Sequence, residues 1–467
     1  MRINKKDIFY TTLFTVFLLA FVVVISVTDS YVKTYYVGGD IMFMRYVPGI
    51  LRILGFISFY VSRHFLEGER IRKITLIIAG AVYLASTIPL VILPFNSYMM
   101  IPVLTLSLAT GHLGGLVYYC MSLAFAVSGH KGKVIGAASS VSILMQYLLT
   151  GYMTSAVKLV FSLCLFLLII YMSIMPPADY VLEDALPYAV GSEAFEHKVN
   201  RQLILIISIV LICTLLACRT DIAFVSLSYE GNINIYSYPR LFMIAGYLTM
   251  GYVADLKDHR IFNTVFFAFV LLSAVLTVMP SAKSGYTFFL SIYYLYISIY
   301  IFFYTYGFIS IAPRTGKPEL WASVGRPLSD LFAAVISVIM IRLGTDDAGS
   351  TPFFFTLYYV LLLIVLYMLM SFINTDPNLS EAGAGEDADG DMDTGAVLSM
   401  DEWLDNYPLT PRERDVAFLL IESDAPIKAI AAELGISERS VYRFAASIYE
   451  KTGADNRTGL VKKFISK

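Results

Sequence analysis

Residues 8–28 read IFYTTLFTVFLLAFVVVISVT, a run of apolar and small polar residues without a charge. A helix needs roughly 20 such residues to cross a hydrocarbon core of about 30 Å, so this stretch predicts a membrane span. The whole chain has the same character, because 57% of its 467 residues are hydrophobic and 15% are charged. Soluble domains are nearer half apolar and a quarter charged. The composition therefore indicates a protein with several membrane spans.

Runs of this length recur along residues 1–375. We expect an all-α fold, a polytopic membrane bundle of about twelve transmembrane helices in two halves of six, separated by a polar loop at about 176–201. The twelve runs lie at about 8–28, 41–61, 74–94, 97–127, 134–156, 159–175, 202–218, 240–256, 262–280, 285–312, 320–342 and 352–373.

The distribution of lysine and arginine in the short loops predicts the orientation. If the N-terminus is cytoplasmic, the inside segments carry fifteen of these residues and the outside segments about six. An even number of spans then returns the C-terminus to the cytoplasm. We expect a multi-pass protein of the cell membrane with both termini inside.

A short motif between the eighth and ninth runs points to a family. Residues 251–260 read GYVADLKDHR, which resembles the Gly-x-x-x-Asp-basic cytoplasmic loop of the major facilitator superfamily. The resemblance implies that Asp255 caps a helix end and that the neighbouring cations anchor it. The first half departs from this pattern, because Phe59 and not an acid stands four residues after Gly55.

Four charged residues fall away from the ends of the predicted second and eleventh spans, where a charge costs at least about 2.5–3.5 kcal/mol. Arg45 and Arg52 are seven residues apart in the second span, and Arg326 and Asp330 are four apart in the eleventh, so each pair shares one helical face. In the fold that the resemblance implies, these two spans face each other. We expect an Arg52–Asp330 pair that latches the halves and leaves Arg45 or Arg326 for an anionic small-molecule ligand. The alternative is that all four form structural pairs.

Two further features of the spans have alternative interpretations. His112 lies among glycines in ATGHLGG, which favours close helix packing over a cavity-lining role. The aromatic run at 291–308, SIYYLYISIYIFFYTYGF, either supplies rings that stack on a ligand or forms a lipid-facing surface.

The composition changes at residues 376–406, where ten Asp or Glu residues occur without a Lys or Arg. Acidic, glycine-rich sequence without apolar periodicity predicts a flexible linker. It separates the membrane region, 1–375, from a domain at 407–467.

This last domain has the pattern of a small helical protein. Thr410, Pro411 and Glu413 form a helix start with a capping box. Ile427, Ile430, Ala431 and Leu434 give a second amphipathic helix, and Gly435 and Ser437 predict a tight turn into a third helix at about 438–451. Two helices joined by so short a turn form a helix-turn-helix.

The third helix has an apolar side and an exposed side. Val441, Phe444, Ala445 and Ile448 cluster on the first, and cations and small residues on the second, as suits a helix in the major groove. Further cations around it suit phosphate contacts. The candidate DNA-binding residues are Lys428, Arg439, Ser440, Arg443, Ser447, Lys451 and Arg457.

In register over about 55 residues, this domain resembles the LuxR/NarL-type helix-turn-helix. The resemblance rests on LTPRE at 409–413, LGIS at 434–437, Ser440-Val441, Ile448-Tyr449, Lys451 and Asn456-Arg457. It implies that the third helix binds the major groove and that a fourth helix, at about 456–465, makes a dimer. Four positions depart from the family's usual residues and are expected to change the DNA sequence recognised: Tyr442, Phe444, Glu450 and Thr452.

These features predict a membrane-embedded transcription regulator with DNA, the lipid membrane and a small-molecule ligand as partners, and RNA polymerase as a further candidate. The alternatives are a secondary transporter with a regulatory tail and a tail that only dimerises. The chain has no motif of a metalloprotease, nucleotide-binding loop or hydrolase, and its four cysteines match no zinc spacing. We therefore expect that the protein is not an enzyme and that it binds no cofactor or metal.

Overall fold

The structure is a computed structural model, and its contacts divide the chain into two units, Met1–Gly383 and Ala384–Lys467. It describes residues 5–35, 40–65, 69–93, 97–125, 130–174, 193–256, 259–278, 285–342 and 351–373 of the first unit, and 403–404, 407–422, 427, 430–431, 434, 436, 438–454, 457, 460 and 463 of the second. The boundary between the units falls in the predicted linker.

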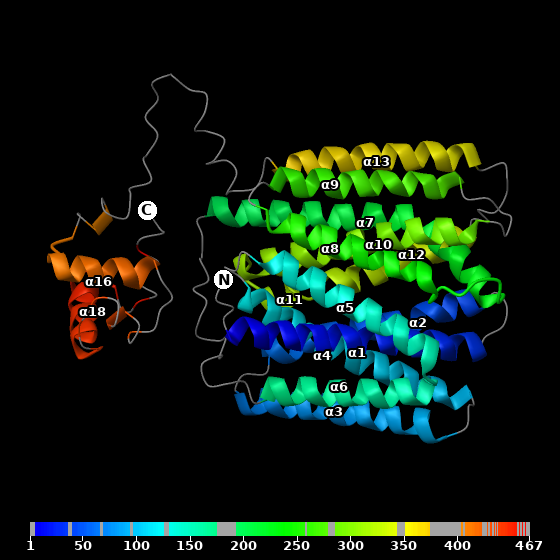
Figure 1. Ribbon diagram of the computed structural model, residues 1–467, viewed down its shortest axis with the longest axis horizontal. Coiled ribbons are helices and arrows are strands. Elements are labelled where there is room, and N and C mark those ends of the chain that lie inside the picture. The colour runs from blue at the N-terminus through cyan, green and yellow to red at the C-terminus, as the bar shows by residue number, and fades with distance from the viewer. Residues whose placement is uncertain are drawn as a thin grey trace. The chain divides into compact units, whose positions relative to one another are not determined.

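The first unit is a helical bundle. Its first half comprises α1 (Lys5–Tyr35), α2 (Asp40–Phe65), α3 (Glu69–Ile92), η1 (Ser97–Met99), α4 (Met100–Ala124), α5 (Lys131–Tyr152) and α6 (Ser155–Ile174). Its second half comprises α7 (Glu193–Tyr229), η3 (Tyr238–Leu241), α8 (Phe242–Ala254), α9 (His259–Leu272), η4 (Ser273–Val278), α10 (Tyr286–Ile311), η5 (Ala312–Arg314), α11 (Pro318–Trp321), α12 (Gly325–Arg342) and α13 (Thr351–Ile373). The helices run side by side, with α3 and α6 at one edge and α9 and α13 at the other (Figure 1).

Each predicted apolar run contains a helix, but the bounds differ in the second half. The run at 202–218 is the middle of α7, which begins at Glu193 and ends at Tyr229. The predicted loop at 176–201 is therefore too long, since 193–201 are helical. Hydropathy ended the run before Arg219 and Asp221, although the helix continues through both. The run at 320–342 is two helices, α11 and α12, with the break between Trp321 and Gly325.

The surface of this unit has the apolar character of a membrane protein. Many large apolar side chains lie on its outside, such as Leu363 and Ile92, which are 66% and 72% exposed. Seven of the described helices are long and apolar enough to cross a membrane, and two shorter apolar helices accompany them. The number of spans, about twelve, stays a prediction.

Close helix contacts hold the bundle together at two glycine pairs. A Cβ on Gly55 of α2 would lie 2.1 Å from the Leu108 carbonyl oxygen and 2.9 Å from the Gly111 Cα of α4, so no larger residue fits there. A Cβ on Gly251 of α8 would lie 2.8 Å from the Gly132 carbonyl oxygen of α5. The second pair joins the two halves, which lets short polar contacts form across their interface.

The second unit has its own buried core. It contains α16 (Pro411–Glu422) and α18 (Glu438–Thr452), and residues 427, 430, 431, 457, 460 and 463 are also helical. Val416, Leu420, Ile430, Val441 and Ile448 lie in this core. The third helix lies where the sequence predicts it, but Gly435, Ser437 and most of the expected fourth helix lie outside the described residues.

The predicted capping box at the start of α16 is confirmed. The Thr410 amide donates to Glu413 Oε2 at 2.7 Å, and the Glu413 amide donates to Thr410 Oγ1 at 3.4 Å. This reciprocal pair satisfies backbone N–H groups that have no partner within the helix.

Candidate functional site

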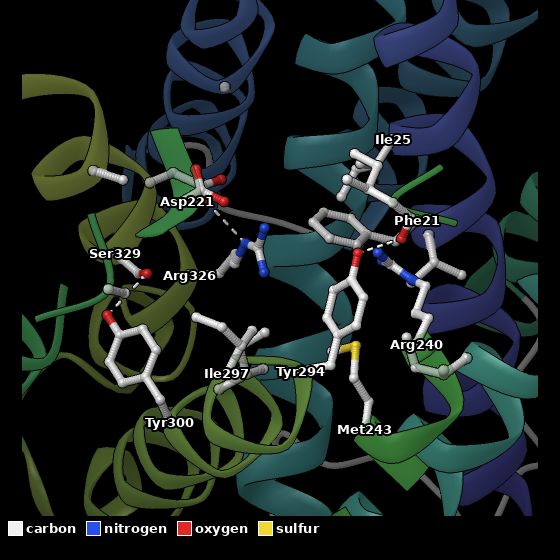
Figure 2. A pocket seen from close by; sticks show the side chains of 18 of the residues that line it. Phe21, Ile25, Asp221, Arg240, Met243, Tyr294, Ile297, Tyr300, Arg326 and Ser329 are labelled. Carbon is white, nitrogen blue, oxygen red and sulfur yellow. Dashed lines mark hydrogen bonds and ion pairs between the residues drawn. The ribbon is translucent and has the colours of Figure 1, made fainter. Parts of the chain in front are cut away.

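A cavity of about 310 Å³ lies between the two halves of the first unit. It is lined by α1, α2, α4 and α5 of the first half and by α7, η3, α8, α10 and α12 of the second. The side chains of Phe21, Tyr294, Arg240 and Arg326 lie around one common space in Figure 2. Small-molecule sites commonly occupy a hollow of this kind, with a few polar groups on a largely apolar lining.

Three of the predicted charged residues form one cluster in this cavity. Asp330 Oδ1 lies 3.0 Å from Arg326 Nε, and Asp330 Oδ2 lies 3.9 Å from Arg52 Nη1. The Phe21 ring centroid is 5.1 Å from the Cζ of Arg52 and 5.4 Å from that of Arg326. Two guanidinium groups therefore share one carboxylate and one aromatic ring.

The fourth predicted residue has a different partner. Arg45 Nη1 donates to Asp221 Oδ2 at 2.9 Å, and Tyr293 donates through its hydroxyl to Asp221 Oδ1 at 2.7 Å. Arg45 is thus held by an acid on α7 in the other half. Asp221 was not among the predicted site residues, although an acid three residues after an apolar run was a signal that could have found it.

A second polar group, of which Asp29, Tyr236 and Arg240 line the cavity, was also missed. The Tyr236 hydroxyl donates to Asp29, and Arg240 Nε donates to Gln146 Oε1 at 2.7 Å. The Arg240 Cζ lies 4.9 Å from the Tyr236 ring centroid and 5.3 Å from that of Tyr294. Asp29 and Gln146 belong to the first half, so these contacts also cross the interface.

The aromatic run on α10 contributes to the cavity lining. Tyr293, Tyr294, Tyr300 and Tyr304 line the cavity and are buried. The Tyr300 hydroxyl donates to Ser329 Oγ at 3.0 Å, as the dashed line in Figure 2 shows. Of the two interpretations of this run, these four rings fit the cavity-lining one.

His112 belongs to α4, contacts α2 and does not line the cavity. Its Nδ1 is 2.8 Å from Ser58 Oγ, and its ring packs edge-on against Phe59. These contacts suit the packing role that the surrounding glycines favour.

The Gly251–Arg260 motif performs the helix capping that the resemblance implied. Asp255 accepts hydrogen bonds from the backbone amides of Gly132 at 2.6 Å and Lys133 at 2.8 Å, at the N-terminus of α5. A carboxylate is favourable there because the free amides carry partial positive charge. In the first half, Phe59 instead packs on Gly115 of α4. His64 at the end of α2 lies 3.4 Å from Glu319 of α11.

In the second unit, α18 has one exposed side, as predicted. Tyr442, Arg443, Ala446 and Glu450 are exposed on it, and Tyr442 is 61% exposed. The Arg443 guanidinium lies 5.3 Å from the Phe444 ring centroid. A helix of this length that exposes Arg443 and Tyr442 suits base contacts in a major groove.

Several other candidate DNA-binding residues are bound within the unit. Glu413 accepts hydrogen bonds from Ser447 at 2.6 Å and from Lys451 at 2.7 Å, and Arg457 donates to the Leu420 carbonyl at 2.9 Å. Burial raises the pKa of Glu413, but the hydrogen bonds from Lys451, Ser447 and Thr410 outweigh it and lower the pKa to about 2. Ser440 is half-buried in α18. Lys428 and the side chain of Arg439 lie outside the described residues.

Comparisons with known proteins bear on each unit separately. Residues 407–464 match the family described as bacterial regulatory proteins, luxR family. None of the curated proteins compared with the chain matches it. Among solved structures, the human organic anion transporter MFSD10 (TETRAN) is similar, with a TM-score of 0.52 and 13% identity over 79% of this chain and 100% of that one.

The transporter FucP of the major facilitator superfamily, in its outward conformation, is also similar. Its TM-score is 0.51 at 9% identity, covering 79% of this chain and 99% of that one. A variant of the Escherichia coli fucose:proton symporter FucP gives 0.50 at 10% identity, with the same coverage. At these identities the similarity shows the fold alone. The chain therefore joins a membrane unit of the major facilitator fold to a C-terminal LuxR-type DNA-binding helix-turn-helix domain.

Proposed function

We propose that the chain is a membrane-embedded, one-component transcription regulator, in which a small molecule bound by the first unit controls DNA binding by the second. The observation that carries this proposal is a charged cavity, lined by both halves of a transporter-like fold, in a chain that also contains a LuxR-type DNA-binding domain. A ligand needs only a different affinity for two conformations of the bundle to shift its population.

DNA binding is proposed to involve two copies of the tail. From Leu409 to Lys467 the chain has ten Lys or Arg and eight Asp or Glu, a net charge of about +2. One copy thus neutralises few phosphates, whereas a dimer on two half-sites doubles the contacts. We assign base contacts to the side chains of Arg443 and Tyr442. We also place the membrane unit in the cell membrane and the tail in the cytoplasm. RNA polymerase is proposed as the partner through which the bound tail acts.

The first test measures binding of residues 400–467 to DNA fragments from around the protein's own gene, at two salt concentrations. The tail is a separate unit with its own core, so it is suited to study by itself. We expect saturable, sequence-dependent binding that weakens as salt rises, because bound cations are released from the phosphates. Equal binding to a random fragment by the folded tail would contradict the proposal.

A second candidate function is secondary transport with a regulatory tail. Its support is the fold, which the first unit shares with a transporter of organic anions and a fucose:proton symporter. Against it, the Gly-x-x-x-Asp motif occurs in the second half alone, and Phe59 replaces the acid in the first half. Accumulation of a solute in vesicles that contain the protein would favour transport over sensing.

A further inference from the structure

The Arg52 guanidinium differs from the other three arginines of the cavity in its hydrogen bonding. Arg45 donates to Asp221, Arg240 to Gln146 and Arg326 to Tyr304. Among the residues that the structure describes, Arg52 donates no hydrogen bond, and its closest carboxylate oxygen is 3.9 Å away. Arg52 is nevertheless only 8% exposed. A buried guanidinium has five N–H donors, and leaving them without acceptors is costly.

The charges around the cavity do not balance. Its lining contains four arginines but three aspartates, Asp29, Asp221 and Asp330. Asp221 is taken by Arg45 and Tyr293, and Asp29 accepts from Tyr236. Arg240 packs over Tyr236, the donor to Asp29, so we set the charge of Asp29 against that of Arg240. Arg52 and Arg326 are then left to share the single negative charge of Asp330, and the excess positive charge lies on these two. An uncompensated charge in the interior of a membrane protein is strongly unfavourable.

We infer that Arg52 is the anchor for an anionic ligand, and that the ligand is a small organic monocarboxylate with an aromatic body. One carboxylate supplies the missing negative charge and accepts in the bidentate geometry that a guanidinium offers. The aromatic body is matched by the lining beside Arg52 and Arg326, where Phe21, Tyr118 and Tyr304 present their rings. A dianion or a cation would leave the charges of the cavity unbalanced.

This inference rests on the proposed sensing function, and it specifies how the ligand changes the bundle. Arg52 belongs to α2 in the first half, and Asp330 belongs to α12 in the second. A carboxylate on Arg52 competes with the Arg52–Asp330 contact and leaves the 3.0 Å Arg326–Asp330 contact within α12 unchanged. Anion binding therefore weakens a contact between the halves, and the ligand favours the conformation in which that contact is broken.

The test uses the full chain in lipid nanodiscs and measures the shift of its unfolding temperature with benzoate, benzyl alcohol, benzylamine and inorganic phosphate. We expect a saturable shift with benzoate alone. Arg52→Gln should weaken benzoate binding by about tenfold or more, because it removes the charge-assisted hydrogen bonds. Asp330→Asn should strengthen binding, because it removes the competing carboxylate and retains both arginines. Arg63→Gln is the matched control, since Arg63 is on α2 but lies over Tyr119 outside the cavity.

Each result supports or overturns the inference. If these residues have only a structural role, benzoate binding should weaken in both cavity variants. Weaker benzoate binding by Asp330→Asn therefore overturns the inference, even where Arg52→Gln fails to fold. A shift with benzyl alcohol as large as that with benzoate would show that the ligand needs no negative charge. A shift with phosphate as large as that with benzoate would show that it needs no aromatic ring. DNA binding is measured on the same samples. If benzoate binds through Arg52 without changing DNA binding, the anion site stands and the sensing function fails. If benzyl alcohol changes DNA binding while benzoate does not bind, sensing stands and the anion site fails.

Discussion

Arg45 and Asp221 are 176 residues apart in the chain, and their side chains meet with Nη1 2.9 Å from Oδ2. The pair joins α2 of the first half to α7 of the second at the lining of the cavity. Both side chains are partly exposed, at 20% and 27%. Because an arginine donates to a carboxylate, the contact is a charge-assisted hydrogen bond, and it joins the two halves.

This pair should behave as a coupled unit. Arg45→Gln and Asp221→Asn should each destabilise the full chain, and the double variant should lose less than the sum, with a coupling of about 1–3 kcal/mol. Urea or thermal unfolding of the four proteins in one detergent measures this coupling. Additive losses would show that the two side chains stabilise the bundle independently.

Asp255 should stabilise the start of α5 across the interface. Asp255→Asn removes the charge from a carboxylate that accepts from Gly132 and Lys133, and we expect a loss of about 1 kcal/mol from the helix cap. The unfolding temperature of the membrane unit in detergent is the measurement. Glu230→Gln is the control, because Glu230 is an exposed acid whose contacts, with Ser226 and Asn232, are local, and it should lower that temperature less.

Glu413 should make the stability of the tail depend on pH. Its pKa is about 2 in the folded tail, below the value of roughly 4.3 expected when unfolded. The folded state thus binds the proton more weakly, so Glu413 contributes stability above the unfolded pKa and loses it as pH falls through the window from about 4 to 2. Denaturant unfolding of residues 400–467 across this range measures the loss.

The matched variant is Glu413→Gln, which retains the shape of the side chain without its charge. It should be less stable than the natural tail at pH 7 by about 1 kcal/mol, as for a lost helix cap. Its stability should also vary less between about pH 4 and 2. The same pH profile in both proteins would assign the acid sensitivity to another group.

Arg443 should contribute to DNA binding through the exposed side of α18. Arg443→Ala should weaken binding by about 1–3 kcal/mol and lower the salt dependence, with the fold and the oligomeric state of the tail unchanged. Fluorescence anisotropy at several salt concentrations measures both effects. Arg412→Ala is the control, because Arg412 is an exposed arginine on α16 that pairs with Asp415. A loss in Arg412→Ala as large as that in Arg443→Ala would place the DNA on a different surface.

The sequence by itself determined the helices and the kind of each unit, because those signals are local. An apolar run of about 20 residues predicts a span wherever it occurs, and Thr410 and Glu413 are close enough in the chain to form their cap within one turn. The Asp255 cap was also predictable, since it belongs to a short motif. The LuxR-type domain was recognised from residues that lie in register over one segment.

Only the tertiary structure decided which charges meet. The sequence placed Arg326 and Asp330 on one helical face and predicted an Arg52–Asp330 pair. It did not show that Asp330 lies 3.0 Å from Arg326 and 3.9 Å from Arg52. The partner of Arg45 lies on α7, beyond the point where hydropathy ended the predicted span. Such pairings depend on how two halves pack across more than a hundred residues of chain, and local composition carries no record of that packing.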